Sequence, residues 1–264
     1  TGISVRVGIV SYSLGGFSQF AVKAFSFWAI QRFAPWRLPL WNPLTWIAYI
    51  LLDDLAGYWF HRASHRYRVL WSAHSVHHSS PDITMANAAR ISPVETLYQP
   101  FANIWAPLLG FPIALYAPMT VIYLLWSQFQ HTRIIGRLGW FDRVFASPSN
   151  HRVHHGINDR YLDKNYGGIL VLWDRMFGTF VAERDDDPPK YGLIHNIDTF
   201  NPIKIAFHEW AAMFRDVGRA RSLREIGGCI FGPPGWRPDG SGPTAANVRA
   251  AWMAAPQGES PAAS

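Results

Sequence analysis

The chain has 264 residues and a net charge of +6, and 49% of its residues are hydrophobic whereas only 16% are charged. Soluble domains carry about 25% charged residues, so this scarcity of charge, together with 13 Trp, 17 Phe and 10 Tyr, favours a protein of the membrane. Two classes are excluded, because the basic residues form no block that would bind nucleic acid, and the single cysteine, Cys229, allows neither a disulfide framework nor a thiolate metal site.

The N-terminal part of the chain contains two aromatic-rich segments. Residues 1–16 lack the features of a signal peptide and do not begin with Met, so we expect a fragment that lacks upstream residues, one or more spans among them. Residues 17–33 are typical of an interfacial helix, of the end of a span or of an ordinary amphipathic helix. The uncharged stretch 38–52 predicts a membrane helix whose inner end becomes polar at Asp53 and Asp54.

Between Glu95 and Arg133 the sequence has no charged residue. A continuous helix of that length would far exceed the roughly 30 Å of a bilayer's hydrocarbon core. Pro107, Gly110 and Pro112 fall in the middle, so we predict two spans joined by a tight turn. Both ends of such a hairpin lie on the same side of the membrane, which places the histidine-rich segments that flank it in one compartment.

After residue 156 the sequence becomes more soluble in character. Residues 201–217 alternate apolar and charged positions with helical period, which predicts an amphipathic helix on the protein or on the membrane face. From Gly227 onward no periodic pattern remains, and we expect irregular and then disordered chain. We therefore divide the sequence into a membrane domain, residues 1–226, and an irregular C-terminal tail, residues 227–264.

Histidine is the residue type that carries chemistry here. Eight of the eleven histidines lie in three short motifs: His61 and His65 in HRASH, His74, His77 and His78 in HSVHH, and His151, His154 and His155 in HRVHH. Residues three or four positions apart share one face of a helix, so each motif directs at least two rings to the same side. One metal ion does not use eight imidazoles, and the set therefore predicts two metal ions with four or five histidines each.

The three remaining histidines differ in context. His131 follows the second predicted span at the membrane face where the motifs lie, and we expect it to be a ninth metal ligand. His195 is more typical of a solvated position or of one behind the ligands, which leaves its role as a ligand open, and His208 in the amphipathic helix is expected to be structural.

Three aspartates are candidates for orienting the ligands. Asp54 lies seven residues, two helical turns, before His61, and we expect it to accept a hydrogen bond from the second nitrogen of a ligand ring. For Asp163 and Asp174 the same role and a salt bridge to a nearby basic residue both remain open.

The chemistry of such a site follows from its donors. Imidazole is a neutral ligand that suits iron, copper and zinc, and a pair of divalent ions held by neutral rings stays strongly cationic. Two irons can share the electrons needed to split dioxygen and to attack an unactivated C–H bond. The protein then has to place a carbon atom near the metals and exclude water, which suits an amphiphilic substrate that reaches from the bilayer.

The motifs and their flanks resemble the fatty acid hydroxylase/sterol desaturase superfamily of integral membrane non-haem di-iron oxygenases. The stretches DLAGYWFHRASH, WSAHSVHHSS, FQHTRIIGRLGWFDRVFASPSNHRVHHG, DKNYGGILVLWDRMFGTF and YGLIHNIDTFNPIKIAF are similar to the alkylglycerol monooxygenase branch and its bacterial relatives, over about residues 45–215. Two departures are present: Ser92 in RISPVE stands where many bacterial relatives have a histidine, and the upstream spans are short or missing, which leaves the access path of the substrate undefined.

The resemblance implies an all-α fold, an integral membrane helical bundle with a histidine-rich cap that faces the cytoplasm. It implies two iron ions held by the eight motif histidines and, less directly, by His131, with the metal centre itself as the oxidant and no side chain assigned as catalytic. It also implies dioxygen as cosubstrate, a fatty acyl, alkyl ether or sterol-like lipid as substrate, and electrons from tetrahydrobiopterin or from an external electron-transfer protein.

Three other functions remain open. The same oxidant can remove a second hydrogen, so the product is either a hydroxylated lipid or an alkene. A membrane zinc hydrolase needs only about three protein ligands and usually a nearby glutamate base, and the motif H-E-x-x-H does not occur. A non-enzymatic metal-binding or transport protein would favour polar residues inside the spans, but residues 96–130 offer only scattered Gln, Asn, Ser and Thr.

Overall fold

The computed structural model describes residues 2, 6, 24–25 and 27–254. The expectations for nearly all of residues 1–16, for residues 17–23 and 26 and for the last ten residues of the tail therefore lie outside the described residues. In the described part all regular structure is helical, and it contains no strand but two isolated bridges, Phe145 to Leu170 and Gly156 to Tyr191. The prediction of an all-α fold is confirmed.

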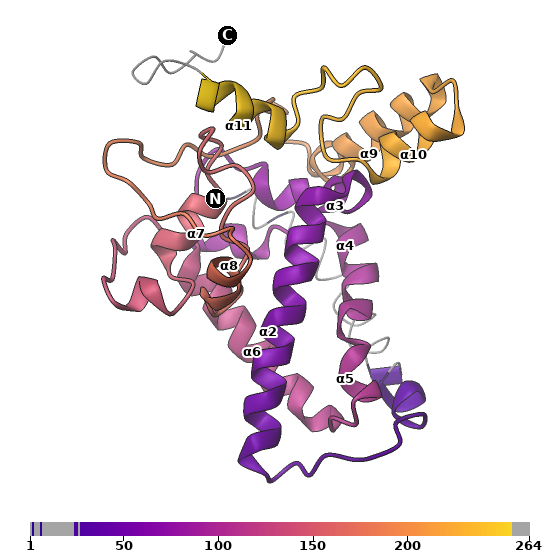
Figure 1. Ribbon diagram of the computed structural model, residues 1–264, viewed down its shortest axis with the longest axis vertical. Coiled ribbons are helices and arrows are strands. Elements are labelled where there is room, and N and C mark those ends of the chain that lie inside the picture. Colours follow the sequence, from indigo (N-terminus) through magenta and orange to yellow (C-terminus); the bar gives the residue numbers. More distant parts are fainter. Residues whose placement is uncertain (1, 3–5, 7–23, 26, 255–264) are drawn as a thin grey trace.

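The longest helix, α2 (Pro43–Arg66), has 24 residues and forms the axis of the molecule (Figure 1). It begins where the Asn42 side chain accepts a hydrogen bond from the Leu44 N–H, a common way to satisfy a free donor at a helix start. It ends at the extended residue Tyr67, and α3 (Arg68–His78) follows at once in a new direction. The sharp change of direction brings the histidines of α3 back toward those of α2.

The predicted hairpin between 95 and 133 is present, but its two arms differ. The first arm is broken into α4 (Pro93–Tyr98), a 3₁₀ turn (Gln99–Asn103) and α5 (Trp105–Leu108), because Pro100 and Pro107 provide no backbone N–H for a continuous helix. The second arm is α6 (Tyr116–Gln130) of 15 residues, preceded by the 3₁₀ turn Ile113–Leu115.

The turn of the hairpin depends on one glycine. Gly110 has φ of 79°, and a Cβ atom there would lie 2.6 Å from the Trp36 carbonyl oxygen. Only glycine tolerates both the left-handed backbone and this close approach.

The predicted membrane spans do not appear as such. The stretch 38–52 is irregular up to Asn42, with a turn at residues 40–41, and becomes part of α2 only from Pro43. Helix α2 then continues through Asp53 and Asp54 into the histidine region. Across the described residues, we find no helix with both the length and the apolar character needed to traverse a bilayer.

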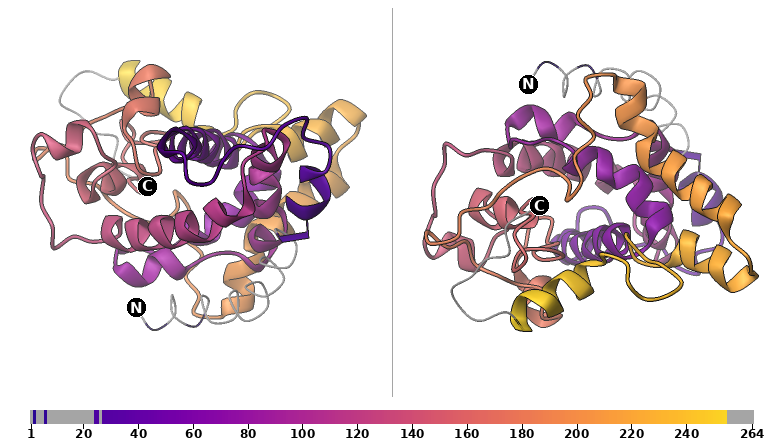
Figure 2. Two further views of the ribbon diagram at one scale, coloured as in Figure 1. Left: turned by 90° about the horizontal axis from the view of Figure 1, so that it is seen from below. Right: turned by 90° about the horizontal axis from the view of Figure 1, so that it is seen from above.

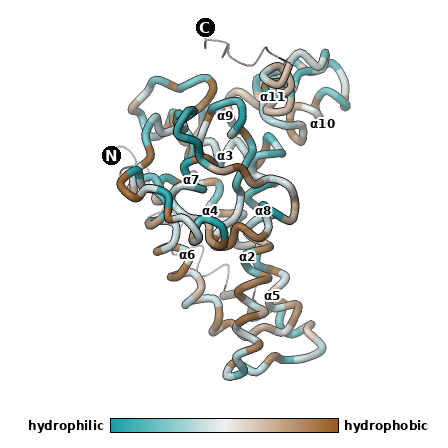
Figure 3. Tube along the Cα trace, turned by 60° about the vertical axis from the view of Figure 1, so that its left-hand side comes forward, coloured by the Kyte–Doolittle hydropathy of each residue, from teal (hydrophilic) through white to brown (hydrophobic). Residues whose placement is uncertain are grey.

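We call residues 36–57 and 104–126 the stem (Figures 1 and 3). Its core is a cluster of buried side chains that Phe27, before the stem, completes: Tyr49, Ala106, Phe111, Leu115 and Met119. Its outer surface carries many exposed large apolar side chains: Trp41, Leu44, Ile47 and Leu51 before and on α2, Leu108, Leu109 and Ile113 at the turn, and Val121, Ile122, Leu124 and Leu125 on α6. The stem is thus apolar both inside and outside.

We call α3 together with residues 131–254 the cap. It contains the 3₁₀ turn Phe141–Arg143, α7 (Pro148–His154), α8 (Leu172–Met176), α9 (Pro202–Arg219), α10 (Leu223–Phe231) and α11 (Ala245–Ala254). The view from above shows α9 and α10 on one side of the upper end of α2, with α11 on the other (Figure 2). Helix α9 is amphipathic, as predicted, and packs on α3, where Arg68 binds Glu209 at 2.8 Å and Asp216 at 2.7 Å.

The C-terminal tail is more helical than predicted. Residues 227–231 complete α10, and α11 begins after Thr244, whose hydroxyl accepts a hydrogen bond from the Asn247 N–H. The expectation of irregular chain from Gly227 is therefore wrong for these two helices and correct for residues 232–244. Alanine is the best helix former, and the Ala-rich run at 245–254 forms a helix although it lacks a clear apolar face.

Candidate metal centre

Nine histidines meet where the stem joins the cap. They come from the C-terminal half of α2, from α3, from the residue that follows α6 and from α7 with its last flanking residue. The structure brings them together in two groups: His61, His65, His74, His78 and His154 in a group of five, and His77, His131, His151 and His155 in a group of four. Within each group one ring nitrogen of every histidine lies within 4.8 Å of the others.

This division is the one expected from the sequence, four or five histidines for each of two metal ions. Each of the motifs HSVHH and HRVHH contributes histidines to both groups, because adjacent histidines of one motif, such as His77 and His78, belong to different groups. His195 and His208 belong to neither group. Metal binding by the nine histidines stays a prediction. The geometry adds which histidines would share each metal ion.

Backbone carbonyls fix the orientation of three rings. Nδ1 lies 3.0 Å from the Tyr166 oxygen in His61, 3.0 Å from the Lys164 oxygen in His154 and 2.6 Å from the Ser127 oxygen in His131. A carbonyl only accepts hydrogen bonds, so each Nδ1 carries the proton and donates, and each Nε2 keeps its lone pair for the centre of its group. This is the usual arrangement behind a metal-bound histidine.

Carboxylates lie behind two further rings. Nδ1 of His65 is 3.5 Å from Asp163 Oδ1, and Nδ1 of His74 is 3.5 Å from Glu95 Oε1. Of the open alternatives for Asp163, the structure thus favours a place behind a ligand ring. Glu95 was not singled out from the sequence, because nothing in its local pattern indicates the contact with His74.

The inward nitrogens lack ordinary partners. The Nε2 atoms of His61, His65 and His74 are buried without a hydrogen-bond partner in the described structure. The other inward nitrogens face one another: His131 Nε2 lies 3.1 Å from that of His77 and 2.9 Å from that of His151. Buried polar atoms are rarely left unsatisfied, and lone pairs at this distance repel unless a proton or a cation lies between them. The donor set therefore fits metal ions.

The protonation state of the rings also suits metal binding. Burial lowers the pKa of His131 to about 4 and that of His154 to about 3. Burial and the neighbouring histidines lower the pKa of His77 and of His155 well below the ordinary value. Neutral imidazole is the form that coordinates a metal, so the rings are ready to bind at neutral pH.

Asp174 and Asp54 hold the loop that carries the Lys164 and Tyr166 carbonyls. Asp174 accepts hydrogen bonds from the N–H groups of Tyr166 and Gly167, each at 2.8 Å, and from the Thr179 hydroxyl at 2.7 Å. Its role is therefore to bind backbone, and the alternative of a salt bridge is not what the structure shows. Tyr166 in turn provides the carbonyl that orients His61.

The prediction for Asp54 needs a correction. Its carboxylate is fully buried and binds the N–H groups of Ile169 and Leu170 at 2.7 and 3.0 Å, the Trp173 indole at 3.0 Å and the Tyr123 hydroxyl at 3.2 Å, rather than a histidine ring. The loop that follows Tyr166 supplies donors closer to Asp54 than the ring of His61. Asp54 thus anchors that loop to α2 and acts on His61 only through it.

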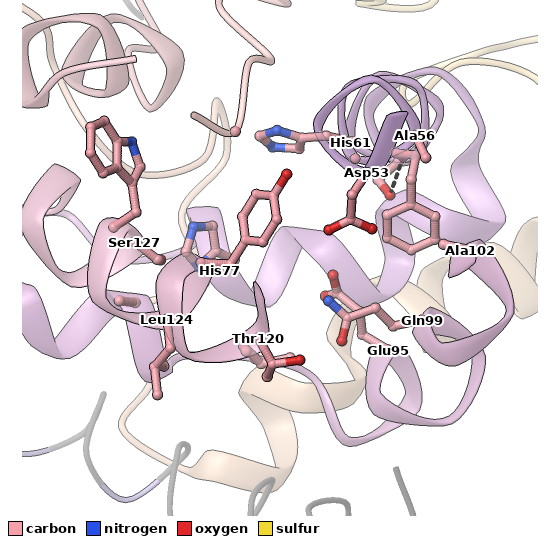
Figure 4. A pocket seen from close by; sticks show the side chains of 18 of the residues that line it. Asp53, Ala56, His61, His77, Glu95, Gln99, Ala102, Thr120, Leu124 and Ser127 are labelled. Atoms are coloured by element: carbon pink, nitrogen blue, oxygen red, sulfur yellow. Dashed lines mark hydrogen bonds between the residues drawn. The ribbon is translucent and has the colours of Figure 1, made fainter. Parts of the chain in front are cut away.

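A cavity of about 420 Å³ lies along α2, α4 and α6 and reaches five of the histidines: His61, His74, His77, His131 and His151 (Figure 4). A second cavity of about 310 Å³ lies under the cap and reaches the other four: His65, His78, His154 and His155. No histidine of the centre borders both, so the two groups form a wall between two cavities. His195 and His208 line the second one.

Ser92, one of the two departures from the expected family pattern, is fully buried and caps α4 by accepting a hydrogen bond from the Val94 N–H at 3.2 Å. Helix α4 carries Glu95 to His74. Serine at position 92 therefore still starts α4, and α4 still brings Glu95 to His74.

Fold and site together define an all-helical protein with a buried, histidine-rich centre fit to hold metal ions. The chain belongs to the fatty acid hydroxylase family, whose sequence profile matches residues 46–179. No solved structure shows significant similarity to it.

Several characterised proteins are similar in sequence. Alkylglycerol monooxygenase of Homo sapiens is 39% identical over 202 residues, which cover 76% of this chain and 44% of that protein. Ornithine lipid hydroxylase of Rhizobium tropici is 30% identical over 132 residues, 50% of this chain and 40% of that protein. A Delta(7)-sterol 5(6)-desaturase of Gibberella zeae is 26% identical over 156 residues, 58% and 47% of the two chains. The chain thus spans less than half the length of these relatives.

Proposed function

We propose that this protein is a non-haem di-iron oxygenase that hydroxylates a C–H bond of a lipid. The observation that carries the proposal is the pair of histidine groups, with inward nitrogens that lack ordinary partners, along one wall of a largely apolar cavity. The reaction balances as C–H + O₂ + 2e⁻ + 2H⁺ → C–OH + H₂O. When bound, the two irons supply the activation of dioxygen.

The chain's own residues hold and orient that centre. Each histidine group provides the donors for one iron ion, and the carbonyls of Tyr166, Lys164 and Ser127 keep the Nδ1 protons of their histidines away from it. The apolar side chains of Phe60 and Met119 line the cavity and exclude water from the reacting carbon.

The cavity is the proposed site of the lipid. The similar proteins are named for alkylglycerols, ornithine lipids and sterols, all of which join an extended apolar part to a polar group. Helix α2 presents Ala56 and Gly57 to the cavity, and an added Cβ at Gly57 would meet nothing within 4 Å. These small residues leave a track along α2 that leads to His61.

We further propose that the stem is inserted in a membrane and that the cap faces the cytoplasm. Leu44, Ile47 and Leu125 are among the large apolar side chains exposed on the stem, and a surface of this extent is typical of a membrane or protein contact. A membrane would deliver a lipid directly to the cavity, one part of which the stem lines. The electrons would come from tetrahydrobiopterin or from an electron-transfer protein.

Desaturation is the second candidate, favoured by the similarity to sterol desaturases. It uses the same centre and the same cavity and differs in the fate of the substrate after the first hydrogen is removed. A zinc hydrolase or a purely metal-binding protein is less well supported, because about three protein ligands are enough for a hydrolytic zinc ion.

Metal analysis tests the proposal. Protein purified without oxygen should contain two irons per chain and should consume oxygen only when both a reductant and a lipid such as 1-O-hexadecylglycerol are present. One zinc per chain and no lipid-dependent oxygen uptake would contradict it. Zinc found beside active iron would not, because zinc competes well for imidazole ligands.

A further inference from the structure

The histidines of the centre separate two cavities. The cavity along the stem is the proposed site of the lipid, whereas the cavity under the cap reaches His65, His78, His154 and His155. None of the nine described histidines of the centre lines both cavities. The second cavity therefore gives another molecule access to the centre on a side that the lipid does not occupy.

The second cavity extends from the surface of the cap to the back of the ligand rings. Among its lining residues Arg66, Ile194 and His195 are exposed. Asp163 also lines it and lies 3.5 Å from Nδ1 of His65, whereas Nε2 of that ring has no hydrogen-bond partner in the described part of the chain. A molecule in this cavity thus faces the outer edge of the His65 ring, and the ring lies between it and the proposed metal ion.

One part of the cavity wall is a flat aromatic side chain. Trp71 lines the cavity, and its ring centroid lies 5.1 Å from that of His65 and 5.5 Å from that of His78. Aromatic rings stack at centroid distances of about 4.5–7 Å, so a planar molecule can pack on Trp71 in the same way. Electron tunnelling weakens steeply with distance, and a planar molecule on Trp71 would lie close to two proposed iron ligands.

The roof of the cavity is preformed. The segment between α10 and α11 lies above α2 and α3 in Figure 1, and together with the first turn of α11 it contributes residues 233–235 and 243–246 to the lining. The Arg68 N–H donates to the Gly232 carbonyl at 2.9 Å, which ties the start of this segment to α3. A roofed space of about 310 Å³ is at the lower end of the range for small-molecule sites, and it is too small for part of a folded protein.

The charges around this cavity favour a neutral occupant. Arg68 is already paired with Glu209 at 2.8 Å and with Asp216 at 2.7 Å, and Asp163 faces His65. The two proposed iron ions add positive charge behind the histidines and would repel a cation. A neutral molecule needs no ionic partner among groups that are already engaged, so shape and stacking would decide what binds.

We propose that the cavity under the cap binds a small, neutral, planar reductant, a reduced bicyclic heterocycle such as a tetrahydropterin, and that Trp71 is the surface on which it stacks. The inference rests on the proposed function, since it assumes iron at both histidine groups. It goes beyond that function by choosing a small reductant over an electron-transfer protein and by locating its site.

The electron balance of this step is closed. In each turnover the heterocycle loses two electrons and two protons and becomes the corresponding dihydro compound. The electrons reduce two ferric ions to ferrous ions, and the protons pass to water at the exposed mouth of the cavity. These two electrons are the ones that the proposed hydroxylation consumes.

Binding without oxygen tests the site. The ferrous protein is titrated with 6-methyltetrahydropterin in the absence and in the presence of saturating 1-O-hexadecylglycerol. We expect one tetrahydropterin per chain and the same affinity in both titrations, because the histidines separate the two cavities. Mutual exclusion of the two ligands, or no binding of the tetrahydropterin, would overturn the inference.

A matched pair of variants on α11 assigns the binding to this cavity. Ala245→Trp fills the cavity from its roof, whereas Ala250 is exposed on the same helix and is not among the described lining residues. We expect Ala245→Trp to lose tetrahydropterin binding and Ala250→Trp to keep it, with full iron content in both. Equal tetrahydropterin binding by the two variants would place the reductant elsewhere.

Substitutions of Trp71 test the stacking surface. Trp71→Leu should weaken tetrahydropterin binding about tenfold, which is the strength of one aromatic stacking contact, and Trp71→Phe should retain most of the affinity. Iron content shows whether His65 and His78, which pack against Trp71, still bind metal in each variant. Trp71→Leu protein with full iron content and undiminished affinity would exclude Trp71 as the stacking surface.

The rate of iron reduction shows whether the bound molecule is the electron donor. The ferric protein is mixed with 6-methyltetrahydropterin without oxygen or lipid, and the loss of ferric absorbance is followed by stopped flow. We expect a rate that saturates with tetrahydropterin concentration, and no such saturation in Ala245→Trp. Lipid oxidation that proceeds with a reduced iron–sulfur protein but not with the tetrahydropterin would overturn this inference and keep the proposed function. A protein that oxidises lipid with neither donor would overturn the proposed function.

Discussion

Asp174 positions His61 without touching it. Asp174 Oδ1 accepts the hydrogen bond of the Tyr166 N–H at 2.8 Å, and the Tyr166 carbonyl oxygen lies 3.0 Å from His61 Nδ1. One peptide unit away, Gly167 binds the other oxygen of the same carboxylate. The orientation of a proposed metal ligand thus depends on a carboxylate more than one hundred positions away in sequence.

The variant Asp174→Asn should weaken both the fold and the centre. An amide in place of the carboxylate leaves one of two buried N–H groups without an acceptor, which costs about 1–3 kcal/mol of the free energy of unfolding. We expect reduced iron content as well, because the carbonyl that orients His61 is released. Urea unfolding and iron analysis measure the two effects.

Asp186→Asn is the matched control, since Asp186 lies on the surface and pairs with Arg184. It should change the free energy of unfolding by less than about 0.5 kcal/mol. An Asp174→Asn protein with the stability and iron content of this control would show that the loop does not position His61.

His154→Ala should deplete only one of the two metal sites. His154 belongs to the group of five, so roughly half of the iron should be lost while the group of four keeps its own. Lipid-dependent oxygen uptake should vanish and the helical circular dichroism signal should persist. His195→Ala, which removes an exposed ring outside both groups, should retain full iron content, and equal iron in the two variants would exclude His154 as a ligand.

Gly57→Leu should block the cavity without disturbing the metals. An added side chain at Gly57 meets no atom within 4 Å at its Cβ and extends into the cavity, and leucine favours a helix more than glycine by about 1 kcal/mol. We expect full iron content, unchanged or higher stability and loss of lipid binding. Gly218→Leu on α9 makes the same change at an equally open position outside the cavity, and lipid binding that survives in both variants would place the lipid elsewhere.

Acid should destabilise the metal-free protein. The pKa of His131 is lowered to about 4 and that of His154 to about 3 in the fold, whereas both are about 6.5 in an unfolded chain. Below about pH 6.5 the unfolded chain therefore binds more protons, and the free energy of unfolding decreases as the pH falls toward the folded values. Each histidine accounts for about 2 kcal/mol between pH 7.5 and 5. Urea unfolding in the presence of a chelator checks this, and equal stability at both pH values would contradict it.

Eight of the nine candidate ligands were accessible from sequence because their spacing is short and helical, and His131 was accessible because it follows an uncharged apolar stretch. In HSVHH and HRVHH the positions i, i+3 and i+4 determine which rings share a face, and the structure distributes them over two groups of the expected size. Gly110 likewise marked the turn of the hairpin. The face that a motif histidine occupies and the position of the turn both depend on residues that are close together in the sequence, so a sequence pattern can predict them.

The supporting contacts were not accessible in this way. The Tyr166 and Lys164 oxygens that bind His61 and His154 are backbone atoms, which every residue has. No pattern of side chains in the sequence can therefore predict these contacts. Asp54 was placed correctly on the face of α2 that leads to His61, but its partners come from a loop more than one hundred residues later. Such long-range pairings depend on how the chain packs, as does the contact between Glu95 and His74.

Isotope labelling tests the central claim most directly. The iron-loaded protein in detergent or in membranes is supplied with a reductant, 1-O-hexadecylglycerol and ¹⁸O₂, and the lipid products are examined by mass spectrometry. We predict oxidised lipid, or the fragment formed directly from it, that contains one ¹⁸O atom derived from dioxygen, and no such product in His154→Ala. Lipid that is unchanged, or oxygen that derives only from water, would contradict a lipid hydroxylase.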